Sequence, residues 1–168
     1  YSRYVRRTAP HLGVDTVPPL IDDWHIELGH HYRSDAVLTE QDDTLAVFTD
    51  PFVSRGRPGT RAPHLVLESG SKRQSSHDLY GRDLVLLCGV DGGPWVDAVD
   101  RMMSPVLAVH QIGAPGGWSD PANAFVESYG VTTTGAVLVR PDGFVAWRAK
   151  EAVAQPAETL ANVLGRVL

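Results

Sequence analysis

Hydrophobic and polar positions follow a regular pattern from His64 to the end of the chain. The run from Leu84 to Cys88 is continuously apolar and of strand length, which is typical of a strand buried on both faces. Residues 106–112, which include His110 and Gln111, are predicted to form a second buried strand and residues 136–139 a third, and residues 65–67 form a shorter apolar run before a turn at Gly70 and Ser71. The pattern therefore predicts a region built around a buried sheet.

Apolar residues also recur at helical spacing in three segments. Pro94 suits the first position of a helix, because its missing N–H would be unpaired there in any case. A second helix is predicted to begin at Ser119-Asp120-Pro121 and to end at Gly130, and a third to begin at Pro156. The residues predicted to face the core are Trp95, Ala98, Val99, Met102 and Met103 in the first helix, Ala122, Phe125, Val126 and Tyr129 in the second, and Leu160, Ala161, Leu164, Val167 and Leu168 in the third.

The order of these elements predicts a fold. A βαβ unit is followed by a helix, a strand, a tight turn at Pro141-Asp142-Gly143, a return strand over residues 144–148 and a closing helix. This order is that of a thioredoxin-like α/β fold, with a central mixed β-sheet flanked by helices. The strand at residues 65–67 and the segment 76–83 before the first core strand are similar to the opening of peroxiredoxins.

The first 62 residues lack this regularity. They are rich in proline, histidine and arginine; residues 1–7 are predicted to end a helix, residues 26–37 to include a short strand, and Asp42-Asp43 to form a turn. Residues 54–63 have the composition of a linker. We therefore predict an irregular extension at residues 1–62 and a thioredoxin-like domain at residues 63–168. The first residue is tyrosine, which fits a fragment as well as a processed chain.

Composition and charge narrow the class of protein. With 43% hydrophobic and 21% charged residues, the chain is predicted to be a soluble globular domain and not a disordered one. Its net charge of -5 argues against a nucleic-acid partner, and no apolar run is long enough to span a membrane. No signal peptide is recognisable, and the single cysteine, Cys88, excludes an internal disulfide; both features favour a cytoplasmic location.

The position where thioredoxin-like proteins carry a reactive thiol offers no nucleophile. That thiol normally follows the first core strand, where the amino terminus of the next helix lowers its pKa. Here residues 89–95 contain no cysteine, serine or threonine, and Cys88 lies one residue earlier, inside the apolar strand. Burial there is expected to raise the pKa of the thiol and keep it inert. A peroxiredoxin-like activity would require Cys88 to react near neutral pH.

Three other groups of polar residues are interpreted as structural. The spacing of His25, His30 and His31 matches no common zinc pattern, and we interpret them as surface or capping residues. Residues 75–78 hold the residue types of a hydrolase triad, but neighbouring positions cannot form one, so a turn is predicted. Residues 113–117 resemble a phosphate loop only faintly, because a proline removes one of the amides. No catalytic, cofactor-binding or metal-binding residue is predicted in this chain.

The basic residues near the predicted domain boundary have two interpretations. Arg57, Arg61 and His64, with the nearby Arg55, can belong to a solvated linker, whose charges contribute little. Alternatively, the guanidinium groups hydrogen-bond acidic or carbonyl groups of another domain, which makes Arg57, Arg61 and His64 candidate interdomain docking residues.

Three segments of the chain resemble one protein family. They read GRPGTRAPH at residues 56–64, HDLYG at 77–81 and GAVLVRPDGFVAWR at 135–148, and a fourth segment, ELGHHYRS, occupies residues 27–34. The first three resemble the C-terminal domain of FAD-dependent phenol and polyketide hydroxylases, and the fourth resembles the segment just before that domain. The resemblance covers about residues 24–150.

This resemblance implies a parent enzyme that reduces FAD with NADH or NADPH and hydroxylates an aromatic ring. The family's dinucleotide, flavin and substrate motifs have no match in this chain, so the resemblance implies a non-catalytic C-terminal domain without cofactor of its own. Its implied role is structural or docking, beside the FAD and substrate domains of the same parent chain, and a homodimer is consistent with the family. The residues alone also permit a free-standing, redox-inactive thioredoxin-like interaction module.

Overall fold

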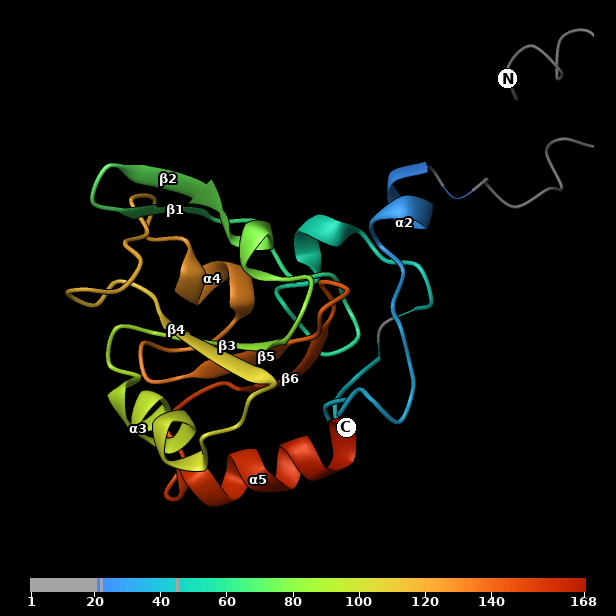
Figure 1. Cartoon of the computed structure of the whole chain (residues 1–168). Helices are drawn as coiled ribbons and strands as arrows, with labels where there is room; N and C mark the ends of the chain where they lie inside the picture. Colours follow the sequence, from blue (N-terminus) through green and yellow to red (C-terminus); the bar gives the residue numbers. More distant parts are fainter. Residues whose placement is uncertain (1–20, 22, 45) are drawn as a thin grey trace, which may run out of the picture.

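The computed structural model describes residues 21, 23–44 and 46–168 (Figure 1). The helix end predicted at residues 1–7 lies outside these ranges. None of the helices in the described ranges is long and apolar enough to cross a bilayer. In chain order the elements are α2 (Asp23–Glu27), η3 (Pro51–Val53), β1 (Val66–Ser69), β2 (Lys72–Ser75), η4 (Ser76–Leu79), β3 (Leu84–Cys88), α3 (Gly93–Met102), β4 (Leu107–Gln111), α4 (Phe125–Tyr129), β5 (Ala136–Val139), β6 (Val145–Ala149) and α5 (Pro156–Val167).

Four strands form the central sheet in the order β4-β3-β5-β6. β3 and β4 run parallel, with Leu84 opposite Leu107, and α3 provides the crossover that a parallel pair needs. β5 runs antiparallel to both β3 and β6, and the predicted turn at residues 141–143 joins β5 to β6. This mixed sheet confirms the predicted thioredoxin-like fold.

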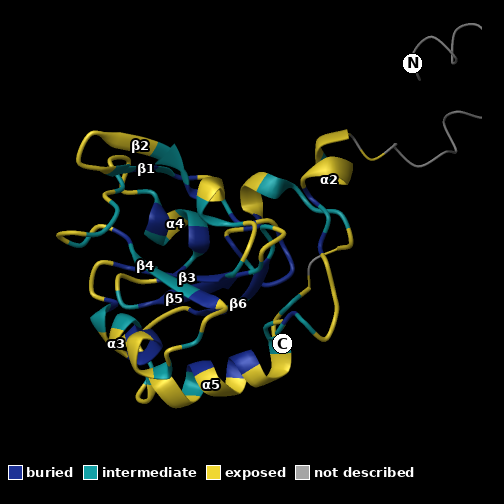
Figure 2. Ribbon diagram, viewed as in Figure 1, coloured by how far each residue is buried: buried dark blue, intermediate teal, exposed yellow. Residues whose placement is uncertain are grey.

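Each face of the sheet has its own hydrophobic core (Figure 2). On one face, Trp95 of α3 and Leu160 of α5 pack against the sheet. On the other face, Phe125 and Tyr129 of α4 pack together with Leu67 of β1. All residues of β3 and β5 are buried, as their continuous apolar runs predicted.

The predicted start of the second helix is wrong by several residues. α4 begins at Phe125, and residues 120–123 form a turn in which the N–H of Asn123 donates to the carbonyl of Asp120 at 2.9 Å and Asn123 has a φ of +50°. Ala122 is consequently exposed and does not face the core. The carboxylate of Asp120 still stabilises the helix start, because its Oδ2 accepts the N–H of Phe125 at 2.7 Å.

Two further core predictions need correction at helix ends. Met103 follows α3 in the left-handed conformation and is 86% exposed, because the helix has ended one residue earlier. In α5 Val163 is buried beside Leu160 and Leu164, whereas Ala161, which was predicted to face the core, is exposed. Leu168 is exposed beyond the last turn. The buried side of α5 therefore follows the narrower spacing of Leu160, Val163 and Leu164.

A short hairpin precedes the core strands. β1 pairs antiparallel with β2 around the predicted turn at Gly70, and η4 follows directly. β2 was not predicted, because its residues are polar and largely exposed and give no apolar alternation.

The extension has little regular structure. Residues 23–27 form a helix, and the strand predicted within residues 26–37 is wrong: the segment contributes one isolated bridge, between His30 and Phe48. The predicted turn near Asp42-Asp43 is present, since the N–H of Asp43 donates to the carbonyl of Glu40 at 3.1 Å.

Residues 54–63 pack along β6 and are not a solvated linker. The N–H of Gly59 donates to the carbonyl of Val145 at 2.7 Å, and the N–H of Val145 donates to that of Thr60 at 2.9 Å. The N–H of Ala62 donates to the carbonyl of Gly143, and Ser54, Thr60 and Ala62 are buried. The glycines and prolines that suggested a linker set the turns of a segment that covers this edge of the sheet.

Candidate functional site

The junction between β3 and α3 carries no reactive group. Cys88, the last residue of β3, is fully buried, and burial raises the pKa of its thiol to about 12. Its Sγ donates to the carbonyl of His110 at 3.8 Å. Asp91 is the first charged side chain after the strand and points into solvent. Because the thiolate is the nucleophile in thiol chemistry, a thiol with this pKa is expected to be inert at neutral pH. The prediction of a buried Cys88 is confirmed.

The glycines of the same junction are packed closely against their neighbours. Flavin and nicotinamide nucleotides bind at strand–helix turns whose glycines let the pyrophosphate approach the backbone. Here a Cβ on Gly89 would collide with the carbonyl of Thr133, and a Cβ on Gly92 would lie 2.7 Å from Cβ of Cys88. Gly89 and Gly92 are therefore required for close packing within the chain.

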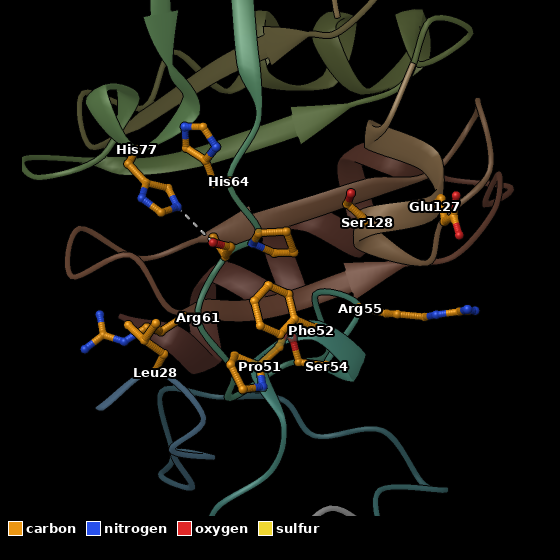
Figure 3. A pocket seen from close by; sticks show the side chains of 12 residues that line it. Leu28, Pro51, Phe52, Ser54, Arg55, Arg61, His64, His77, Glu127 and Ser128 are labelled. Atoms are coloured by element: carbon orange, nitrogen blue, oxygen red, sulfur yellow. Dashed lines mark hydrogen bonds between the residues drawn. The ribbon is translucent and has the colours of Figure 1, made fainter. Parts of the chain in front are cut away.

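A cavity of about 580 Å³ lies between the extension and the domain (Figure 3). Its lining is mostly apolar, with guanidinium and imidazole groups and one carboxylate among the lining side chains. The lining residues are Leu28, Pro51, Phe52, Ser54, Arg55, Arg61, Ala62, Pro63, His64, His77, Glu127 and Ser128. This arrangement can accept an apolar side chain together with an acidic group.

The structure places two of the three predicted docking residues in this cavity. Arg61 stacks its guanidinium over the ring of Phe144, 5.0 Å from the centroid. His64 lies edge-on to His77, with 5.4 Å between ring centroids. Arg57 does not line the cavity: it belongs to the preceding turn, where its carbonyl accepts the hydroxyl of Thr60 at 2.7 Å.

A pair of tyrosines behind the cavity was missed by the sequence analysis. The hydroxyl of Tyr129 donates to the carbonyl of Pro63 at 2.7 Å and lies 3.1 Å from the hydroxyl of Tyr80. Burial raises the pKa of Tyr80, and burial together with the neighbouring Tyr80 raises the pKa of Tyr129 well above its ordinary value. Both phenols are therefore neutral, and the pair fixes α4 against the cavity wall. No sequence signal relates residues 63, 80 and 129.

Arg148 in β6 holds the extension, α4 and the sheet together. Its Nε and Nη2 donate to the two carboxylate oxygens of Glu40 at 2.7 and 3.0 Å. Its Nη1 donates to the carbonyls of Arg55 at 2.6 Å and Tyr129 at 2.7 Å. An arginine within an otherwise apolar strand is a signal that could have revealed this residue, because buried arginines need partners.

The other constellations prove structural in the part of the chain that is described. His31 is buried, so its interpretation as a surface residue is wrong: its Nε2 lies 3.1 Å from the carbonyl of Pro58 and 3.4 Å from a carboxylate oxygen of Asp43. Residues 75–78 form the predicted turn, in which Ser75 and Asp78 make reciprocal side-chain caps. Among the described residues no three histidine, cysteine or acidic side chains gather as a metal site would require.

Known proteins that resemble the chain form a consistent group. A family model described as "Aromatic-ring hydroxylase, C-terminal" matches residues 55–168. A 4-methyl-5-nitrocatechol 5-monooxygenase from Burkholderia sp is 40% identical over 174 residues, covering 100% of this chain and 32% of that protein. The aklavinone 12-hydroxylase RdmE from Streptomyces purpurascens is 41% identical, covering 98% of this chain and 31% of the relative. The chain thus spans about a third of the length of these relatives.

Solved structures agree with these relatives. A ternary complex of aklavinone-11 hydroxylase with FAD and aklavinone superposes with a TM-score of 0.84 at 40% identity, covering 99% of this chain and 31% of that one. The flavin-dependent monooxygenase PieE, in complex with FAD and substrate, gives a TM-score of 0.71 at 40% identity, covering 84% of this chain and 26% of that one.

Proposed function

Because the chain belongs to the family of aromatic-ring hydroxylase C-terminal domains, we propose that it is the non-catalytic carboxy-terminal domain of an FAD-dependent aromatic-ring monooxygenase. The observation that carries the proposal is the family match over residues 55–168 of a chain that spans about a third of its relatives. The buried Cys88 thiol, with its raised pKa, and the lack of cysteine, serine and threonine in residues 89–95 support a domain that contributes no reacting group.

In this proposal the chemistry belongs to the rest of the parent chain. NADH or NADPH reduces the FAD bound there, and an aromatic substrate is hydroxylated with oxygen. The present domain packs against the FAD and substrate domains, and Arg61 and His64 contribute to that contact while Arg57 shapes the adjacent turn. The single buried cysteine and the nicotinamide requirement favour a cytoplasmic location. A homodimer of the parent stays a prediction.

Expression of the complete open reading frame that contains this chain tests the proposal. We expect FAD to co-purify and a phenolic or polyketide substrate to stimulate NADH or NADPH oxidation, with the hydroxylated product identified by mass. A reading frame that encodes no flavin-binding region would remove the proposal.

A further inference from the structure

We infer that the exposed apolar side chains of the extension form the docking surface for the FAD- and substrate-binding part of the parent chain. The inference rests on the proposed function and adds the surface and its chemistry. We call this surface the extension face and define it by Trp24, Leu28, Phe52 and Val53.

Large apolar side chains are unusually exposed on the extension face. Phe52 is 87% exposed, Trp24 65%, Val53 59% and Leu28 38%. Single exposed hydrophobic residues are ordinary on protein surfaces, but a group of them marks an interaction site. Tryptophan and other aromatic residues are also enriched at the centres of interfaces.

The two elements that carry this face are joined to each other. Trp24 and Leu28 lie one helical turn apart, so they share a side of α2. The N–H of Thr49 donates to the carbonyl of Gly29 at 2.9 Å, which brings the end of α2 to the start of η3. Leu28 and Phe52 then line the same cavity (Figure 3). The backbone contact between Gly29 and Thr49 and the shared cavity lining thus bring the apolar residues of α2 and η3 to the same part of the extension.

The charges beside this face indicate what the partner carries. Arg55 and Arg61 line the cavity next to Phe52, and neither forms a salt bridge within the described ranges. An apolar surface with carboxylates at its rim would complement them. A second copy of the same face would instead bring further arginines. About two thirds of the length of the relatives lies outside the region matched by this chain. We propose that the corresponding part of the parent chain, which binds FAD and substrate, covers the extension face.

Photo-cross-linking of the full-length parent tests this surface. Phe52 is replaced by p-benzoylphenylalanine, and the matched control places the same residue at Met103, which is 86% exposed at the end of α3. Light and heavy isotope-labelled proteins are mixed before irradiation, so that cross-links within one chain can be separated from those between copies. We expect the Phe52 probe to cross-link within the same chain to a peptide that precedes residue 1, and the Met103 probe not to.

Each other outcome of the cross-linking overturns the extension face: a cross-link to a second copy, a cross-link only within these 168 residues, or none. The flavin content and hydroxylation rate of the unirradiated protein distinguish a failure of the extension face from a failure of the proposed function. If the parent binds flavin but the Phe52 probe does not cross-link to a peptide before residue 1, the extension face is wrong and the proposed function stands. The expected cross-link in a protein without flavin would support the surface and remove the proposed function.

A substitution gives a second measurement. Phe52→Glu in the parent places a carboxylate in the apolar contact, and we expect the rate of limited proteolysis between the two parts to rise about tenfold or more, because interface anchors dominate binding. Met103→Glu should leave that rate unchanged. Equal rates for the two variants would overturn the inference.

Discussion

The extension and the thioredoxin-like domain differ in how far their apolar side chains are buried. Of the 27 buried hydrophobic residues in the described ranges, only Val37 and Ala62 precede His64. Twelve large hydrophobic residues of the described part of the chain are exposed; eight of them lie in residues 21–53, and four, namely Val90, Met103, Val106 and Leu168, lie beyond. The domain buries its own core, whereas the extension presents apolar surface outward. This difference is what the docking surface proposed for the extension requires.

The largest expected effect concerns the link between the two regions. Arg148→Met should lower the free energy of unfolding by about 2–3 kcal/mol, because the carbonyls of Arg55 and Tyr129 and the partly buried carboxylate of Glu40 lose their donor, although Lys150 still pairs with Glu40. Urea denaturation of the 168-residue chain measures this effect. Arg82→Met, at a side chain that is 94% exposed, should change the value by less than about 0.5 kcal/mol. Equal losses in the two variants would contradict the role assigned to Arg148.

A smaller effect is expected where the domain fixes the cavity wall. Tyr129→Phe removes the hydroxyl that donates to Pro63, and the carbonyl is left without this donor. The free energy of unfolding should fall by about 1–2 kcal/mol. Tyr32→Phe, at a ring that is 38% exposed, serves as the control. If both variants unfold alike, the hydrogen bond of Tyr129 does not stabilise the wall.

The contact between the regions should also respond to pH. Burial alone would raise the pKa of Glu40, but hydrogen bonds and charges from Arg148 and Lys150 lower it below its ordinary value. A carboxyl with a lowered folded pKa stabilises the fold above its unfolded pKa of about 4.3, and this contribution is lost as the pH falls through the folded pKa. Glu40→Gln should therefore flatten the acid side of the stability curve. Urea midpoints at a series of pH values, with the exposed Glu151→Gln as control, would show it.

The smallest effect is expected at the β3–α3 junction. Asp91→Ala in the full-length parent should leave the hydroxylation rate within about twofold, because the exposed carboxylate contacts no reacting group. A steady-state rate assay measures this. A large loss of rate with unchanged flavin content would show that the junction takes part in the chemistry.

The sequence predicted the fold better than it predicted the surface. The apolar runs of β3 and β5 and the helix that begins near Pro94 determine the buried sheet, because burial on both faces requires continuous apolar strands. The start of α4 was misplaced, because Asp120 caps the helix across a five-residue separation. Residues 54–63 were interpreted as a linker because their backbone pairing with β6 cannot be recognised from their composition.

The candidate site depended on contacts between distant parts of the chain. Arg61 and His64 were found because they lie within a recognisable motif. Glu40 and Arg148, in contrast, are 108 positions apart, and no local pattern connects them. Phe52 resembles any core residue in the sequence, and only the arrangement of α2 and η3 shows that it is exposed.

A flavin-binding titration of the isolated 168-residue chain tests most directly whether this domain leaves the chemistry to its neighbour. The chain is mixed with FAD, passed through a desalting column and examined for flavin absorbance, then assayed with NADH, NADPH and a phenolic substrate. We predict no retained flavin and no nicotinamide oxidation. Stoichiometric flavin in the protein fraction, with turnover that a single side-chain replacement abolishes, would contradict the account.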